Sequence, residues 1–267
     1  MKDLDAAALR DAYDAQLRAH IPDPLPEGTT VEYDGPLVRM TGLDPGGFLT
    51  YRDLGGLAGD ELDALIARQR DLFTERGQQV EWKLHGHDRP ADLAQRLVAH
   101  GFEPQERETV LIGPVAPIAA ERSEPPPGVR VRQVTTGADL ERIARMEEAV
   151  WGEDRTWLAD GLQRELAADP DALSILVAET DEEVVSAGWI RYLAGTEFVT
   201  LWGGSTLPQW RRRGIYRALV SHRARLAKAR GFTLMQVDAS DDSRPILERL
   251  GLVAVTTTTP YVYTPQP

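Results

Sequence analysis

The chain has 267 residues, of which 42% are hydrophobic and 27% charged, a composition typical of a soluble globular protein with room for two domains. Its net charge of −12 argues against general nucleic-acid binding, and its apolar runs are too short to span a membrane. There are no cysteines, which excludes disulfides, zinc–thiolate sites and an acyl-cysteine intermediate; with no secretory signal visible, we expect a cytoplasmic protein.

Residues 1–113 alternate between helical and strand spacing of their apolar side chains. Amphipathic helices are predicted over residues 4–19, 60–76 and 91–100. Strands are predicted as a hairpin over residues 31–41, which turns at Asp34-Gly35, and over residues 48–51, 80–84 and 109–112. The glycine-containing turn over residues 54–60 is acidic, so no phosphate-binding loop is expected in this half.

Residues 113–128, GPVAPIAAERSEPPPG, are proline-rich and without a periodic pattern, which indicates a linker. The predicted domains are therefore residues 1–113 and 129–267, joined by residues 114–128. In the second domain, helices are predicted over residues 138–150, 157–168, 214–230 and 245–250. Strands are predicted over residues 129–134, 174–180, 184–192, 198–206, 233–238, 253–257 and 261–264.

The two halves repeat a helix–strand–helix–strand order with similar landmarks. The landmarks are Arg76-Gly77, Arg89-Pro90 and His100-Gly101 in the first pass, and Arg230-Gly231, Arg244-Pro245 and Leu250-Gly251 in the second. We interpret the repeat as a degenerate duplication. The N-terminal half would then support its partner or help to shape an acceptor cleft.

The segment LPQWRRRGIYRAL, residues 207–219, is the most informative about chemistry. It lies within residues 198–237, which hold eight Lys or Arg and no Asp or Glu. Backbone N–H groups at a helix start lack partners and, with the helix dipole, bind phosphate oxygens. Gly214 allows the backbone to approach a ligand, and Arg211, Arg212 and Arg213 add positive charge. The segment is a candidate phosphate site, and the alternative is a solvated basic helix start.

These residues resemble the pyrophosphate loop of the GNAT acetyltransferase superfamily, Gln/Arg-x-x-Gly-x-Gly/Ala. Residues 211–216 match this pattern, with Tyr216 departing at the last position. The turn Ser205-Thr206-Leu207-Pro208 and the later Arg249-Leu250-Gly251-Leu252 also resemble family motifs, and the resemblance covers residues 129–264. It implies an α/β (α+β) fold in two related domains, with a mixed sheet that is flanked by helices and splays between residues 198–206 and 233–238.

The resemblance further implies acetyl-CoA as co-substrate, with no metal. The pyrophosphate would be held by the amides of Arg211, Arg212, Arg213, Gly214, Ile215 and Tyr216. Thr206 and Leu207 would meet the pantetheine arm, and Ser240 stands where the family often has a hydrogen-bonding Asn. The implied reaction is direct acetyl transfer to a primary amine of a small molecule or peptide. Nothing in the sequence indicates the oligomeric state.

The family's general acid is commonly a Tyr at the position held here by Leu247. Tyr216, Tyr261 or Tyr263 could substitute, although packing is the favoured interpretation of each. Some members of the family manage without such an acid, because a CoA thiolate is a tolerable leaving group.

A base is needed because an alkylamine is mostly protonated at neutral pH. Residues 199–206 hold no acid, and Glu197, just before them, is the nearest candidate; the alternative is an exposed charge at a strand start. The further candidates for the base are Glu147, Glu148, Glu153 and Asp154, although the favoured interpretation of these acids is that they face solvent or bind a cationic acceptor.

Weaker signals lie elsewhere. The pair Gly203-Gly204 predicts a bulge, and Trp202 could line the acyl or acceptor site, although a core position is favoured. The run His85-Gly86-His87-Asp88 is interpreted as a polar loop rather than a metal site. Two other functions stay open: a non-catalytic acyl-CoA-binding or sensing protein, and a phosphate-binding α/β protein of another class.

Overall fold

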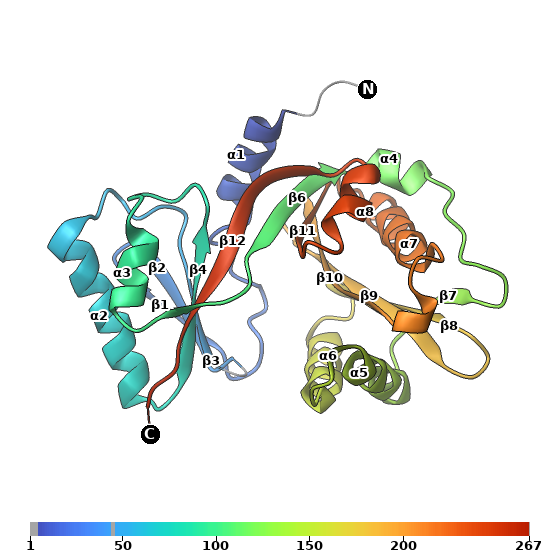
Figure 1. Cartoon of the computed structure of the whole chain (residues 1–267), viewed down its shortest axis with the longest axis horizontal. Helices are drawn as coiled ribbons and strands as arrows, with labels where there is room; N and C mark the ends of the chain where they lie inside the picture. Colours follow the sequence, from blue (N-terminus) through green and yellow to red (C-terminus); the bar gives the residue numbers. More distant parts are fainter. Residues whose placement is uncertain (1–4, 44–45, 267) are drawn as a thin grey trace. The chain divides into compact units, whose positions relative to one another are not determined.

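The computed structural model describes residues 5–43 and 46–266 of the chain (Figure 1). Two compact units are present. Unit 1 contains the described residues up to Val110, the segment Asp238–Asp241 and the chain from Ala254 onward; unit 2 contains Leu111–Val237 and Asp242–Val253. The predicted bounds, residues 1–113 and 129–267, therefore differ from the observed units, because the last strand pairs with a strand of unit 1.

Unit 1 has a mixed sheet. Its helices are α1 (Ala6–Gln16), α2 (Gly59–Glu75) and α3 (Leu93–Ala99). Its strands are β1 (Thr30–Asp34), β2 (Leu37–Thr41), β3 (Gly46–Thr50), β4 (Gln79–His85), β5 (Glu103–Pro104), the start of β6 (Glu108–Pro114) and most of β12 (Val253–Tyr263). Strands β1, β2 and β3 are antiparallel neighbours, β3 and β4 are parallel, and β12 pairs antiparallel with β4. Leu4, the first residue of the helix predicted over residues 4–19, lies outside the described residues.

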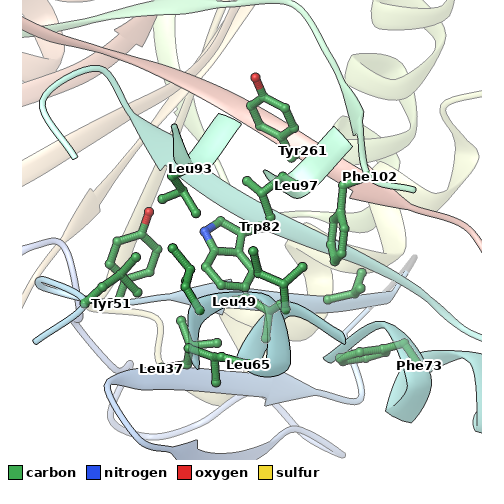
Figure 2. Close-up of a cluster of buried hydrophobic side chains, with 14 residues drawn as sticks. Leu37, Leu49, Tyr51, Leu65, Phe73, Trp82, Leu93, Leu97, Phe102 and Tyr261 are labelled. Carbon is green, nitrogen blue, oxygen red and sulfur yellow. The ribbon is translucent and has the colours of Figure 1, made fainter. Parts of the chain in front are cut away.

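The core of unit 1 forms where α2 and α3 meet one face of this sheet (Figure 2). The helical spacing of Leu62, Leu65 and Ile66 places all three on the buried stripe of α2. They share a cluster with Trp82 of β4, whose ring stands edge-on to that of Tyr51 at 5.8 Å between centroids. Each of these fully buried side chains stabilises the fold by roughly 1.5–3 kcal/mol.

Unit 2 has a mixed sheet, to which residues 111–114 at the end of β6 contribute together with the strands given below. Its helices are α4 (Val115–Ala120), α5 (Gly137–Trp151), α6 (Thr156–Ala168), α7 (Ile215–Ala229) and α8 (Arg244–Arg249). Its strands are β7 (Arg130–Val134), β8 (Leu173–Glu179), β9 (Val184–Tyr192), β10 (Phe198–Thr206) and β11 (Leu234–Ala239), of which the last two residues belong to unit 1. Strands β7 to β10 are antiparallel neighbours, and β11 is parallel to β10.

Helices cover both faces of the unit 2 sheet, with α5 and α6 on one face and α7 on the other (Figure 1). The alternation along β8 shows this directly. Ile175 and Val177 pack in the cluster formed with α5 and α6, whereas Leu176 and Ala178 pack in the cluster formed with α7. Burial on both faces explains the unbroken apolar run over residues 175–178 of β8.

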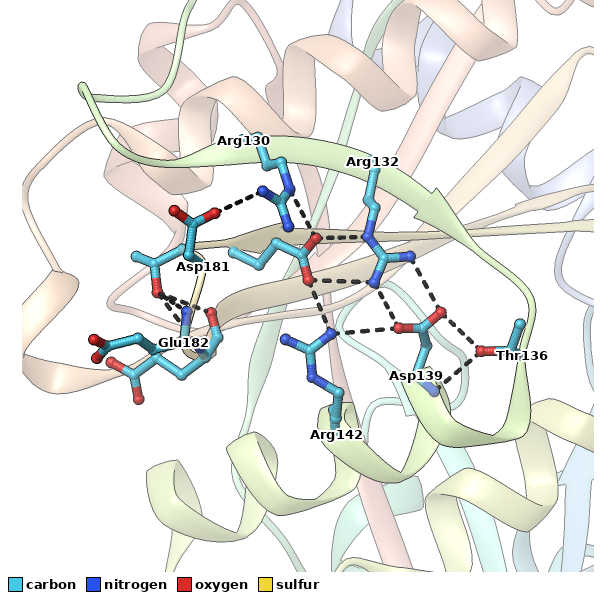
Figure 3. A network of polar contacts seen from close by, with 10 residues as sticks. Arg130, Arg132, Thr136, Asp139, Arg142, Asp181 and Glu182 are labelled. Atoms are coloured by element: carbon cyan, nitrogen blue, oxygen red, sulfur yellow. Dashed lines mark hydrogen bonds and ion pairs between the residues drawn. The ribbon is translucent and has the colours of Figure 1, made fainter.

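A charged network fastens α5 to the sheet (Figure 3). The carboxylate of Glu179, at the end of β8, is 1% exposed and accepts hydrogen bonds from Arg130 (3.1 Å), Arg132 (2.6 Å) and Arg142 (3.0 Å). Asp139, in the first turn of α5, also pairs with Arg132, which lowers the pKa of Asp139 to about 2. The network fixes the strand β7 and the start of the helix that carries the site described below.

Two sequence predictions are corrected in the described structure. The strands predicted over residues 253–257 and 261–264 form one strand, β12, because Pro260 stays in the ladder and its carbonyl accepts from the N–H of Gln105 at 2.8 Å. Part of the predicted linker is the helix α4, which buries Val115 and Ile118 and packs against α7. Pro117 lies in the first turn of α4, where a missing N–H breaks no helical hydrogen bond.

Candidate functional site

Strands β10 and β11 separate part-way along their length. In the described structure they pair from Phe198 to Thr200, whereas β10 continues to pair with β9 as far as Thr206. Gly203 and Gly204 have φ angles of 65° and 95° and lie at a shift of register, which is the predicted bulge. The last six residues of β10 thus diverge from β11, which confirms the predicted splay.

A basic turn connects the splayed end of β10 to α7. Arg211 donates from Nε to the carbonyl of Thr206 (3.0 Å), and the guanidinium of Arg213 lies 4.8 Å from the ring centroid of Trp210. Gly214 precedes α7 with a φ of 83°, no side chain caps the helix, and no atom lies within 4 Å of a Cβ placed on Gly214. The start of α7 thus combines an uncapped helix end, open space at Gly214 and three exposed arginines, an arrangement that favours an anion.

Two side chains of α7 hold the bulged part of β10. The ring of Tyr216 lies against Gly204, where an added Cβ would come within 2.8 Å of it. Arg223 is 1% exposed, and its Nη1 donates to the carbonyls of Trp189 (3.1 Å) and Trp202 (3.2 Å). Burial lowers the pKa of Arg223 and raises the pKa of Tyr216. These contacts give the backbone of the bulge a fixed orientation.

A buried carboxylate meets β10 beyond the bulge, on the face covered by α5. Glu147 is 5% exposed, and its Oε2 accepts from Ser205 Oγ (2.9 Å) and Trp151 Nε1 (2.8 Å). Its Oε1 is buried without a hydrogen-bond partner. Burial raises the pKa of Glu147, although the hydrogen bonds from Ser205 and Trp151 and the charge of Arg155 act in the opposite direction. Glu147 is thus a proton acceptor with one oxygen uncommitted.

Of the interpretations offered for these acids, a solvent-facing side chain is wrong for Glu147, which is buried, whereas Glu148 and Glu153 are exposed. Contact of Glu147 with a cationic acceptor and its role as a base stay predictions. The burial of Glu147 could have been predicted from its position in the sequence of α5. Glu147 lies on the same helical stripe as Leu140 and Ile143, both of which are buried. An acid on a core stripe is more informative than one on an exposed face, because burial of a charge requires partners.

Residues 139–252 match the sequence model of the Acetyltransferase (GNAT) family. This segment is a GNAT-family domain. The match includes the splayed strands, the basic turn, and the helices that carry Glu147 and Arg223. No curated protein sequence matches the chain significantly.

The fold of the whole chain is similar to that of several solved structures. A GCN5-related N-acetyltransferase from Kribbella flavida is 19% identical with a TM-score of 0.70, over 98% of this chain and 96% of that one. A tandem GNAT protein from the clavulanic acid biosynthesis pathway is 13% identical with a TM-score of 0.62, over 91% and 85%. A functionally unknown conserved protein from Staphylococcus epidermidis is 12% identical with a TM-score of 0.66, over 91% and 97%. At these identities the likeness shows a shared fold.

The other residues predicted to contact CoA differ in their burial and in the unit to which they belong. Thr206 ends β10 with its hydroxyl 2.9 Å from that of Ser186, and Leu207 is buried in the cluster with α5 and α6. Ile215 is 1% exposed and packs in the cluster on the α7 face of the sheet, and the contact of its amide with CoA stays a prediction. Ser240 follows β11 and belongs to unit 1, and its contact with CoA stays a prediction.

The geometry of the GNAT domain does not support Glu197 as the base. Glu197 is exposed, lies just before β10 and accepts from the hydroxyl of Thr233 at 3.3 Å. Ser205, which donates to Glu147, lies toward the other end of β10, on the order of 25 Å from Glu197 at roughly 3.3 Å per residue. Glu147 is the better-placed carboxylate.

The tyrosines considered as general acids also differ in their surroundings. Tyr261 is part of the unit 1 core, and the hydroxyl of Tyr263 lies 2.8 Å from that of Thr74 in the same unit. Leu247 of α8 is fully buried. Tyr216 is the member of this group that lies against the bulge of β10.

The corresponding turn of unit 1, between β3 and α2, borders a cavity of about 320 Å³. Its charged lining is balanced, with Asp14, Asp53, Asp88, Arg18, Arg52 and Arg89. Arg18 and Asp88 form a buried ion pair at 2.7 Å, so this turn lacks the surplus positive charge of the turn before α7. Within residues 5–43 and 46–266, no cluster suited to a metal ion occurs, and no helix has the length and apolar character to cross a membrane.

Proposed function

We propose that this protein is a cytoplasmic N-acyltransferase that moves an acetyl group from acetyl-CoA to a primary amine of a small molecule or peptide. The observation that carries the proposal is the exposed basic turn at the start of α7, directly beside the splayed end of β10. CoA combines a pyrophosphate with an extended, amide-bearing arm. The turn offers N–H groups and positive charge to the pyrophosphate. The diverging edge of β10 offers backbone hydrogen-bond partners to the amide-bearing arm.

The residues present fit this co-substrate. The amides of residues 211–216 would hold the pyrophosphate, with Gly214 leaving room for its oxygens. Thr206 and Leu207 would contact the pantetheine arm where β10 ends. Tyr216 replaces the small residue usual at the end of the family's loop, and its ring is turned toward Gly204 rather than into the turn.

Glu147 is the proposed base. The acceptor ammonium first loses one proton, which Oε1 of Glu147 accepts directly or through one water. The amine nitrogen then forms a bond to the thioester carbonyl carbon, and the carbon–sulfur bond breaks. CoA leaves as a thiolate, which takes up the second proton from the nitrogen. The raised pKa of Glu147 makes it a stronger base than an exposed carboxylate.

Leu247 is apolar and fully buried, so position 247 cannot supply a proton to the thiolate. Tyr216 is an alternative proton donor to the thiolate, and in that case the second proton of the nitrogen passes to the Tyr216 phenolate. Burial raises the pKa of Tyr216, so its hydroxyl stays protonated at neutral pH. Arg223 assists indirectly by fixing the bulge through the carbonyl of Trp202.

A non-catalytic acyl-CoA-binding or sensing protein is the second candidate, favoured by Leu247 and by the lack of an acid in residues 199–206 of β10. The full chain incubated with acetyl-CoA and a panel of primary amines distinguishes the two. Amine-dependent release of CoA thiol supports the transferase. Calorimetric binding of CoA without release for any amine indicates the sensor, and absence of binding refutes both.

A further inference from the structure

Two exposed indole rings flank the short loop between α5 and α6. Trp151, at the end of α5, is 58% exposed, and Trp157, at the start of α6, is 51% exposed. The Nε1 of Trp151 donates to Glu147 and also to Ser205 (3.1 Å), so the polar edge of this ring is fixed while much of its face stays open. Open apolar rings beside a buried carboxylate mark a surface for a ligand with both an apolar and a charged part.

A cation of the chain already lies between these rings. The guanidinium carbon of Arg155 is 5.9 Å from the ring centroid of Trp151 and 5.8 Å from that of Trp157. Its positive charge also lowers the pKa of Glu147, which places it within electrostatic reach of the carboxylate. Two ring quadrupoles and one carboxylate therefore favour a positive charge at this place.

Arg155 is held there weakly. Its guanidinium pairs at 3.1 Å with Glu153, whose side chain is 74% exposed, and such surface pairs stabilise little. Its Nε is buried without a hydrogen-bond partner. The side chain of Arg155 is 24% exposed and belongs to the loop over residues 152–155, whose other residues are exposed. A second cation with a better apolar fit could displace it into solvent.

We infer that the acceptor is a primary amine carried on a flat apolar ring, an arylalkylamine, whose ammonium replaces Arg155 between Trp151 and Trp157. The inference rests on the proposed acetyl transfer and narrows its acceptor. The ring lies against the indole faces, and the ammonium reaches Glu147, which takes its proton. An acceptor with a carboxylate beside its amine would bring a second negative charge toward Glu147.

Binding is measured by calorimetry on the full chain in the presence of CoA, which carries no acetyl group, so that no turnover occurs. The probes are phenethylamine, butylamine as an ammonium without a ring, 2-phenylethanol as a ring without a charge, and phenylalanine as the same amine with a carboxylate. We expect phenethylamine to bind about tenfold more tightly than each of the other three.

Matched variants locate the binding site. Arg155→Met should tighten phenethylamine binding about threefold, because the competing cation is gone; Arg145→Met, a change of equal charge at a 65% exposed side chain of α5, should not. Trp157→Ala should weaken binding about fivefold, and Trp157→Leu, which keeps apolar volume, should do the same. Tyr33→Ala, at a 68% exposed ring in unit 1, should leave binding unchanged.

Two results would overturn the inference. Tightest binding of phenylalanine, weakened by Arg155→Met, would make Arg155 an anchor for an acceptor carboxylate. Equal binding of butylamine and phenethylamine would remove the role of the ring. Release of CoA thiol separates the inferred acceptor class from the proposed function. If the amines bind as expected but no thiol is released from acetyl-CoA, the transfer is refuted and the cation site is kept. If thiol release is fastest with butylamine or phenylalanine, the transfer is kept and the inference is refuted.

Discussion

Replacing Glu147 with glutamine removes one negative charge and keeps the shape of the side chain. The amide oxygen can take the place of Oε2 and accept the hydrogen bonds from Ser205 (2.9 Å) and Trp151 (2.8 Å). The amide nitrogen then stands where Oε1 already lacks a partner. Each retained hydrogen bond weakens by about 1 kcal/mol when its acceptor loses its charge. Loss of the desolvation penalty of the carboxylate offsets this, because the raised pKa of Glu147 shows that burial outweighs its hydrogen bonds.

The pH dependence of stability follows from the same shift. Because the pKa of Glu147 is higher in the fold than in the unfolded chain, the protonated side chain favours folding. This stabilisation is complete below about pH 4 and is lost as the pH rises through the raised pKa. Glutamine stays neutral, so the Tm of Glu147→Gln relative to the wild type should increase between pH 4 and pH 7.

The activity of Glu147→Gln should fall relative to the wild type, whereas its relative Tm rises with pH. The base must be deprotonated, so kcat/KM of the wild type should rise with pH through the pKa of Glu147, and this limb should disappear in Glu147→Gln. Turnover, followed by thiol release, should fall about 10²–10⁴-fold while calorimetric affinity for CoA holds. Glu197→Gln, an exposed carboxylate at the far end of β10, is the matched control. Near wild-type turnover and an unchanged pH profile in Glu147→Gln would refute the assignment, and loss of turnover in the control would return Glu197 as the candidate.

Three further outcomes are expected. Gly214→Asp should abolish the single CoA site seen by calorimetry, because it places bulk and negative charge among the phosphate oxygens. The control Gly56→Asp changes a glycine of unit 1 with a similarly positive φ of 81° and open space around it, and CoA affinity should stay unchanged. Two equal CoA sites in the wild type would contradict this prediction. Leu247→Ala should lower the free energy of unfolding in urea by about 2–5 kcal/mol, since Leu247 is fully buried, yet keep the shape of the pH–rate profile; a lost titration would show that position 247 takes part in proton transfer after all. Initial-rate plots against amine and acetyl-CoA should intersect, because a chain without cysteine offers no thiol for an acyl-enzyme, and parallel lines would argue for a covalent intermediate elsewhere.

Local patterns in the sequence predicted the bounds of β9 and β10, and Gly203-Gly204 predicted the bulge. These features depend on residues close together in the chain, namely apolar alternation and the permissive backbone of glycine. The basic turn before α7 was also predictable from the sequence, because Gly214 directly follows its three arginines. Its contact with CoA stays a prediction.

Features that depend on distant residues were not predictable in this way. Glu147 is buried because Ser205, 58 residues later, supplies a hydroxyl on β10. The membership of β12 in unit 1 depends on its pairing with β4, whose partners such as Trp82 and Tyr261 are far apart in sequence. The helix α4 was not predicted, because the five prolines of residues 113–128 indicate irregular structure. One of them, Pro117, lies in the first turn of α4, where a helix tolerates proline.

The pairing of β12 with β4 has a consequence for synthesis on the ribosome. Strand β4 emerges early, but its antiparallel neighbour emerges only after the whole GNAT-family domain has been translated. Until then Val80–His85 lacks its β12 partner, and an unpaired strand edge invites association with other chains. A fragment cut between the two units would keep that edge permanently, so the N-terminal half expressed without residues 254–266 should aggregate even though most of its core side chains are present.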